Sequence, residues 1–173
     1  GEQLLTSYIT HEFLRPNLPP DAVCTIAFTS SDLWPGDGWN FVFGEASLRG
    51  RVGVWSLSRF GDPAESDESF HKCLTRTLKV ATHETGHLFT IEHCIAWNCN
   101  MRGCNSLYES DRYPMWLCPE CMAKVCYSTR SDPVNRYLRL AEFCARIGLK
   151  EEVMMFERSA DALVEAGYPW NPN

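Results

Sequence analysis

Three of the five histidines lie in one short run, residues 83–93, whose sequence is HETGHLFTIEH. Residues four apart share a helix face, so His83 and His87 can direct two imidazoles at one cation. His93 can supply a third ligand and leave the fourth tetrahedral position open to water, which distinguishes a catalytic zinc from a structural one. Glu84 is then placed to act as a base on that water, so the run predicts hydrolytic metal chemistry.

The residues before this run have the periodicity of an amphipathic helix. On a helix that turns about 100° per residue, five mostly apolar residues would lie in a stripe along one face. His83 and His87 would lie on roughly the opposite face. The stripe contains Leu74, Leu78, Ala81, Thr85 and Leu88. The alternative, that the histidines only pack or face solvent, is therefore disfavoured. His11 and His71 have no such context and are predicted to be surface residues.

Nine cysteines form the second unusual feature, and six of them lie between residues 94 and 126. An odd total cannot pair fully within the chain, and the cluster contains the knuckle-like Cys118-Pro-Glu-Cys121. A closed tetrahedral thiolate site prefers zinc, and its binding free energy would order an irregular loop. The predicted ligands of this structural zinc are Cys94, Cys99, Cys118 and Cys121. Cys104 and Cys126 remain alternative ligands, and disulfides or buried thiols remain alternative explanations.

The elements that must position these groups follow from apolar periodicity, β-branched runs and turn residues. Helices are predicted over residues 3–14, 68–89, 121–126, 134–147 and 150–165, and strands over 21–30, 39–48 and 51–60. Gly148 and Gly167 stand where C-terminal helix caps are expected. Strands early and helices late predict an α+β domain.

Length and composition limit the remaining possibilities. A chain of 173 residues predicts one domain over residues 1–173, with the sheet and active-site helix in 1–93 and a zinc-stabilised loop and C-terminal helices in 94–173. The net charge of −6 argues against a nucleic-acid partner, and no apolar run approaches the length of a membrane span. With no visible signal peptide and many cysteines, a cytoplasmic monomer is expected.

The combined pattern resembles the archaemetzincins, a zinc-peptidase family of the metzincin clan. In this chain the pattern is His-Glu-x-x-His-x5-His-Cys-x4-Cys-x-Met over residues 83–101, followed by Cys-x-x-Cys at 118–121. Two upstream segments, Phe43-Gly44-Glu45-Ala46 and residues 51–56, are also similar to strands of that family. The resemblance covers residues 21–126.

The resemblance implies a zincin-like fold, with a twisted mixed sheet packed on an active-site helix and a helical C-terminal part. It implies two zinc ions, one catalytic at His83, His87 and His93 with Glu84 as general base. The other would be structural, at Cys94, Cys99, Cys118 and Cys121. Met101 would match the methionine of the clan's Met-turn, although on its own it could equally fill an apolar pocket.

One position departs from the clan pattern. Members usually have glycine three residues after the second histidine, where the chain leaves the helix, and this chain has Thr90. A β-branched residue at positive φ is strained by about 1–2 kcal/mol. Two outcomes are therefore expected: a turn of different backbone shape, or a Thr90 that stays helical with a later bend.

A substrate-binding strand is predicted at Gly44, Glu45 and Ala46. Glycine weakens a central strand and a charge blunts edge-to-edge aggregation, so these residues suit a sheet edge. A peptide could pair with their backbone by β-augmentation and lie over the metal. A Gly44→Pro change is expected to disturb only the rim of the cleft. The alternative is that the strand is merely one half of a hairpin.

The favoured function is a zinc-dependent endo- or aminopeptidase acting on peptides or proteins. The rival is a catalytically silent protein of the same fold that binds peptides or a partner without cleaving them, because Thr90 departs from the clan pattern. A zinc-finger-like reader of nucleic acid is a third alternative, which the acidic balance disfavours.

Overall fold

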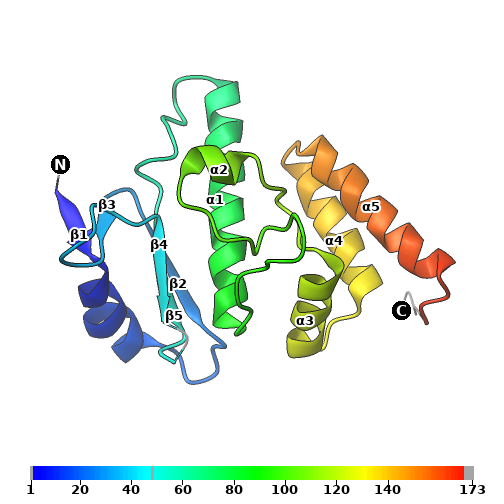
Figure 1. The fold of residues 1–173 in the computed structure, drawn as a ribbon, viewed down its shortest axis with the longest axis horizontal. Helices are drawn as coiled ribbons and strands as arrows, with labels where there is room; N and C mark the ends of the chain where they lie inside the picture. The colour runs from blue at the N-terminus through cyan, green and yellow to red at the C-terminus, as the bar shows by residue number, and fades with distance from the viewer. Residues whose placement is uncertain (1, 48, 170–173) are drawn as a thin grey trace. The chain divides into compact units, whose positions relative to one another are not determined.

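The computed structural model of the chain describes residues 2–47 and 49–169 (Figure 1). The chain divides into two compact units, Gly1–Met115 and Trp116–Asn173. The single domain expected for residues 1–173 stays a prediction. Leu48, the last residue of one predicted strand, lies outside the described residues.

The described residues of the first unit form five short strands in two sheets. Strand β1 (Gln3–Leu5) pairs in parallel with β3 (Asp32–Trp34). Strand β5 (Val52–Ser56) lies between β2 (Thr25–Thr29), to which it is parallel, and β4 (Gly44–Ser47), to which it is antiparallel. The second sheet is therefore mixed, and together with the helices it confirms the predicted α+β class.

The N-terminal helix predicted over residues 3–14 is wrong in its first part. Residues 3–5 form strand β1, and helical structure begins only with η1 (Tyr8–Leu14), a π-type helix followed by the 3₁₀ turn η2 (Arg15–Asn17). The reason is long-range pairing: β1 finds a partner in β3, 29 residues away, and local periodicity does not report such a partner.

The predicted strands are all shorter in the structure. Residues 21–30 contribute only β2, which is half-buried because it lies at an edge of its sheet. Of residues 39–48 only β4 is a strand, since the segment before it makes a single bridge between Val42 and Leu33. Residues 51–60 contribute β5, whose five positions are all buried because strands flank it on both sides.

The two faces of the mixed sheet are packed differently. One face carries a core of Leu14, Leu33, Val52 and Val54. On the other face the fully buried indole of Trp55 lies across two glycines, since a Cβ at Gly44 would be 2.2 Å from the indole and one at Gly53 would be 2.7 Å away. These glycines therefore make room for Trp55.

Helix α1 (Asp67–Leu88) packs on β4 and β5 and carries two of the predicted metal ligands. The Ser66 hydroxyl caps its N-terminus by accepting a hydrogen bond from the Ser69 N–H at 3.1 Å, and Asp67 lies in the positive first turn. The predicted helix over 68–89 is thus confirmed.

After α1 the chain is irregular, as predicted, apart from the short helix α2 (Leu107–Asp111). This helix is fastened to α1 by charge. Lys79 Nζ donates to the Ser110 carbonyl at 3.1 Å, and the Arg76 guanidinium forms a bidentate ion pair with Asp111 at 2.6 and 2.9 Å. The loop that follows the histidine run is therefore held against α1.

The described residues of the second unit form α3 (Pro119–Thr129), α4 (Pro133–Arg146) and α5 (Lys150–Glu165). Helices α4 and α5 pack side by side, and Gly148 and Gly167 follow their ends with a φ of 78° each, as predicted for helix caps (Figure 1). Among the described residues, no helix combines the length and apolar character needed to cross a bilayer.

Candidate metal centre

The three histidines of the run come together within the first unit. The ring centroids of His83 and His87 are 4.7 Å apart, and those of His93 lie 5.3 and 4.9 Å from them. One ligand nitrogen from each ring lies within 4.8 Å of the other two. The arrangement draws on helix α1 for two ligands and on the loop after it for the third.

Hydrogen bonds fix which nitrogen each helical histidine presents. His83 Nδ1 donates to the Asn100 carbonyl and His87 Nδ1 donates to the Ile91 carbonyl, each at 2.7 Å. Since carbonyls only accept, both rings carry their proton on Nδ1 and both Nε2 atoms bear lone pairs. These two Nε2 atoms are 3.1 Å apart, close to the roughly 3.3 Å between two nitrogens on one tetrahedral zinc. Two lone pairs this close fit a shared cation.

Burial keeps these imidazoles neutral, which is the form that binds metal. It lowers the pKa of His83 to about 4, even though the hydrogen bond to Asn100 acts in the opposite direction. Burial likewise lowers the pKa of His87. His93 is more exposed.

Glu84 lies in the same cleft as the histidines. Burial, with a smaller contribution from the negative charge of Glu45, raises the pKa of Glu84 to about 7. A cation held by the histidines would oppose this rise, because positive charge favours the carboxylate. The side chain is thus placed to take up and return a proton beside the three imidazoles.

The turn after α1 has the usual backbone shape, with threonine where glycine is expected. Thr90 has a φ of 62°, its N–H donates to the His87 carbonyl at 2.8 Å, and the Ile91 N–H donates to the Gly86 carbonyl at 3.0 Å. These two bonds define a Schellman motif. Both outcomes expected from the sequence are therefore wrong, since Thr90 neither stays helical nor changes the turn, and instead adopts the strained conformation.

Two glycines allow the loop to approach the histidines closely. A Cβ at Gly86 would lie 2.3 Å from Met101 Sδ, and Met101 is fully buried against the helix at this point. A Cβ at Gly103 would lie 3.1 Å from the His93 ring. Met101 thus supports the helix segment between the two helical ligands, and Gly103 lies beside the third ligand.

Asn100 is a positioning residue that the sequence did not reveal. Its carbonyl accepts the His83 hydrogen bond, and its own side-chain amide donates to the Lys79 carbonyl at 3.0 Å. The residue is buried, with 6% of its surface exposed. Asn100 therefore ties the loop to helix α1 one turn before His83. Its place directly before Met101 was the only signal that the sequence offered.

The histidines and Glu84 line a cleft of about 640 Å³, together with the predicted strand residues Gly44, Glu45 and Ala46. As expected from the sequence, β4 is an edge strand. The Thr6 hydroxyl donates to the Glu45 carboxylate at 2.5 Å, which fastens β4 to the segment before η1. The expectation that Gly44→Pro would disturb only the rim is wrong, because Gly44 underlies the buried indole of Trp55.

The four predicted cysteine ligands are all buried, and two of them lie in each unit. In the first unit, Cys99 Sγ accepts the Met101 N–H at 3.4 Å. In the second, Cys118 caps helix α3 by accepting the Cys121 N–H at 3.4 Å. Joint binding of one metal ion by both pairs stays a prediction.

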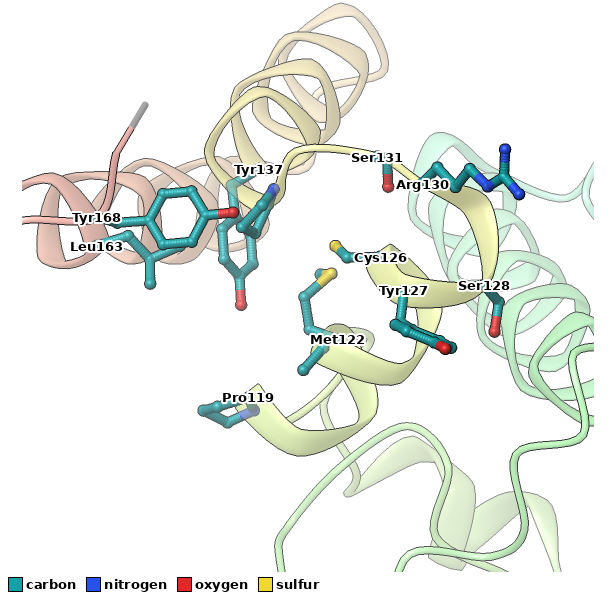
Figure 2. Close-up of a pocket in the computed structure, with 12 residues that line it drawn as sticks. Pro119, Met122, Cys126, Tyr127, Ser128, Arg130, Ser131, Tyr137, Leu163 and Tyr168 are labelled. Atoms are coloured by element: carbon teal, nitrogen blue, oxygen red, sulfur yellow. The ribbon is translucent and has the colours of Figure 1, made fainter. Parts of the chain in front are cut away.

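A second cavity, of about 820 Å³, lies in the second unit and does not include these groups. Figure 2 shows that Met122, Cys126 and Tyr137 from α3 and α4 surround it, with Leu163 and Tyr168 at one side. None of the predicted zinc ligands and no residue of the histidine run line this cavity. His83, Glu84, His87 and His93 line instead the cleft of the first unit.

Comparison with known proteins places this site in a family. The model of peptidase family M54 matches residues 17–126. Archaemetzincin-2 of Macaca fascicularis is 37% identical over 158 residues, covering 76% of this chain and 44% of that protein. The structure of archaemetzincin from Methanopyrus kandleri matches with a TM-score of 0.62 at 34% identity, covering 74% of this chain and 67% of that one.

A structure described as a zinc-dependent peptidase from Methanocorpusculum labreanum matches with a TM-score of 0.54 at 26% identity, covering 66% of this chain and 68% of that one. The chain spans less than half the length of the curated Macaca relative. The family match contains the whole histidine run and all four predicted cysteine ligands. The resemblance drawn from the sequence is confirmed, and the chain belongs to peptidase family M54.

Proposed function

We propose that this protein is a zinc-dependent peptidase in which His83, His87 and His93 hold the catalytic zinc. The observation that carries the proposal is the 3.1 Å approach of two Nε2 lone pairs, with both Nδ1 protons committed to carbonyls. Family membership supports the same conclusion. Bound zinc would supply Lewis acidity, which polarises a peptide carbonyl and makes water acidic enough to lose a proton near neutral pH.

Glu84 moves the protons in this mechanism. Its carboxylate accepts one proton as the water oxygen bonds to the peptide carbonyl carbon, and it returns that proton to the nitrogen as the carbon–nitrogen bond breaks. One water is consumed, and a carboxyl group and an amine are released. The buried setting of Glu84 suits this role, because few competing water molecules surround the carboxylate.

The test is Glu84→Gln, which keeps the shape of the side chain and removes its basicity. Hydrolysis of a peptide library should fall by at least about a hundredfold, the usual contribution of general acid–base catalysis, while zinc content is unchanged. Glu92→Gln is the matched control, because Glu92 is an exposed glutamate beside His93. Equal turnover by the Glu84→Gln and unmodified proteins would refute the assigned role.

We further propose that an extended peptide pairs with the outer edge of β4. The Ser56 N–H donates to the Phe43 carbonyl at 2.8 Å, so residues 43 and 56 form a hydrogen-bonded pair. In an antiparallel ladder such pairs alternate, which turns the backbone groups of Gly44 and Ala46 away from β5. Those free groups border the cleft and can bind substrate backbone.

An Ala46→Pro change tests this pairing, since it removes an outward N–H and an edge strand tolerates proline. The loss of one hydrogen bond should raise KM about fivefold while zinc stays bound. Ala46→Gly keeps the N–H and serves as the control. An unchanged KM in folded Ala46→Pro protein would show that substrate is not held on β4.

The finer features of the family pattern are also proposals. We propose a zincin-like arrangement in which Met101 forms the Met-turn, supported by its buried contact at Gly86. A second, structural zinc at Cys94, Cys99, Cys118 and Cys121 is supported by their spacing and burial. A thiolate site requires reducing conditions, which is the basis for proposing a cytoplasmic location. We also propose that the protein acts as a monomer.

A further inference from the structure

Arg102 enters the cleft at a rigidly held point of the loop. It follows the fully buried Met101 and precedes Gly103, which lies against the His93 ring. The Arg102 N–H donates to the Cys99 carbonyl at 2.9 Å. The side chain is exposed and lines the same cleft as Glu84 and the histidines. Its backbone is therefore fixed beside the metal centre while its guanidinium can reach substrate.

The guanidinium rests on an aromatic platform. Its carbon lies 5.2 Å from the centroid of the Tyr113 ring, within the range of a cation–π contact. The platform is itself held, because the Tyr113 hydroxyl donates to Glu109 Oε1 at 2.5 Å. This contact places the guanidinium over the ring face and leaves its N–H donors available to a further ligand.

The neighbouring charges are already engaged. Glu109 Oε2 accepts the Asn105 N–H at 3.0 Å, so both oxygens of this nearby acid have partners. The Asn105 and Tyr113 hydrogen bonds, followed by the more distant charge of Arg102, lower the pKa of Glu109. Lys79, the other cation of the cleft, is buried and donates to the Ser110 carbonyl.

Arg102 differs in this respect from two other arginines of the first unit. Arg59 and Arg76 each form a bidentate ion pair, with Asp32 and Asp111 respectively. In the part of the chain that the structure describes, no carboxylate lies within ion-pair distance of Arg102. The cleft thus presents a guanidinium that is held over Tyr113 and has no carboxylate, its usual bidentate ligand, within ion-pair distance among the described residues.

We propose that Arg102 binds a carboxylate of the substrate and so makes the enzyme select peptides that carry an acidic group. This inference rests on the proposed peptidase function. The carboxylate can belong to an aspartate or glutamate side chain near the cut, or to the C-terminus of a short peptide. Both offer the same two oxygens to the guanidinium fork.

The experiment compares matched peptides on the unmodified and Arg102→Gln proteins. In the first arm, the two peptides of a pair differ only in having Glu or Gln at one position near the cut, and each position is tested in turn. In the second arm, the two peptides of a pair differ only in having a free or an amidated C-terminus. In the unmodified protein, kcat/KM should be at least about tenfold higher for the acidic member of one pair. Arg102→Gln should reduce that ratio to about one.

Arg112→Gln is the matched control, since Arg112 is also exposed and lies 5.7 Å from a tyrosine ring, that of Tyr108, but does not line the cleft. It should retain the full ratio. A ratio near one in the unmodified protein for every pair, or a ratio that survives Arg102→Gln, would overturn the proposal.

A binding measurement separates this proposal from the peptidase function. Fluorescence anisotropy with the same labelled peptides on the zinc-loaded Glu84→Gln protein reports affinity without turnover. The acidic peptide should bind at least about tenfold more tightly than its neutral partner, and the added Arg102→Gln change should abolish the difference. Such a result would support the carboxylate site even if no cleavage were found, and equal affinities would refute it.

Discussion

Replacing Thr90 by glycine should stabilise the protein. Thr90 occupies the left-handed position of a Schellman motif with a φ of 62°, its side chain is exposed, and its hydroxyl makes no hydrogen bond among the described residues. Glycine at this position relieves about 1–2 kcal/mol of strain. The greater freedom of glycine in the unfolded chain costs about 0.5–1 kcal/mol. The free energy of unfolding should therefore rise by about 0.5–1 kcal/mol.

The protein provides its own comparison for this change. The α4 and α5 ends have the same two hydrogen bonds, with Gly148 and Gly167 at the left-handed position. Gly148→Thr should lower stability by about as much as Thr90→Gly raises it.

The assay is urea unfolding followed by tryptophan fluorescence, at one fixed zinc concentration because bound metal adds to apparent stability. A gain of this size corresponds to about 1–4 °C in Tm. Unchanged or reduced stability of Thr90→Gly would refute the strain argument. A gain with loss of zinc would show that threonine is needed to place His93.

Two further predictions concern the metal sites. Gly86→Ala should lower the free energy of unfolding by about 1–3 kcal/mol and weaken zinc binding, because the new methyl group would overlap the buried Met101. Stability and zinc affinity equal to those of the unmodified protein would show that Met101 can move aside. Elemental analysis of protein purified without chelator should give about two zinc equivalents, and mild chelation should remove the three-histidine metal first while circular dichroism is retained. One equivalent, or unfolding at the first step, would contradict the two assigned sites.

Features encoded locally could be predicted from the sequence. The extent of α1 follows from its apolar stripe and the spacing of His83 and His87, and the ends of α4 and α5 follow from Gly148 and Gly167. These signals act within a few residues, and in α1, α4 and α5 no pairing with a distant segment overrides them.

Features that depend on distant contacts could not be predicted. Strand β1 exists because β3 pairs with it, and Gly44 is required because Trp55 lies over it. Asn100 orients His83 through a carbonyl, a group that every residue possesses. Thr90 shows the reverse case, in which surrounding contacts impose a conformation that the residue type disfavours.

The central claim is that zinc held by the three histidines makes this protein a peptidase. The most direct test is to add zinc back to metal-free protein and measure the rate of peptide hydrolysis. The unmodified protein should be inactive without metal and gain activity in proportion to zinc until the histidine site is filled. His87→Ala, which removes one of the two Nε2 atoms that lie 3.1 Å apart, should stay inactive at every zinc concentration. Peptide cleavage by the metal-free protein, or full activity of His87→Ala, would contradict the claim.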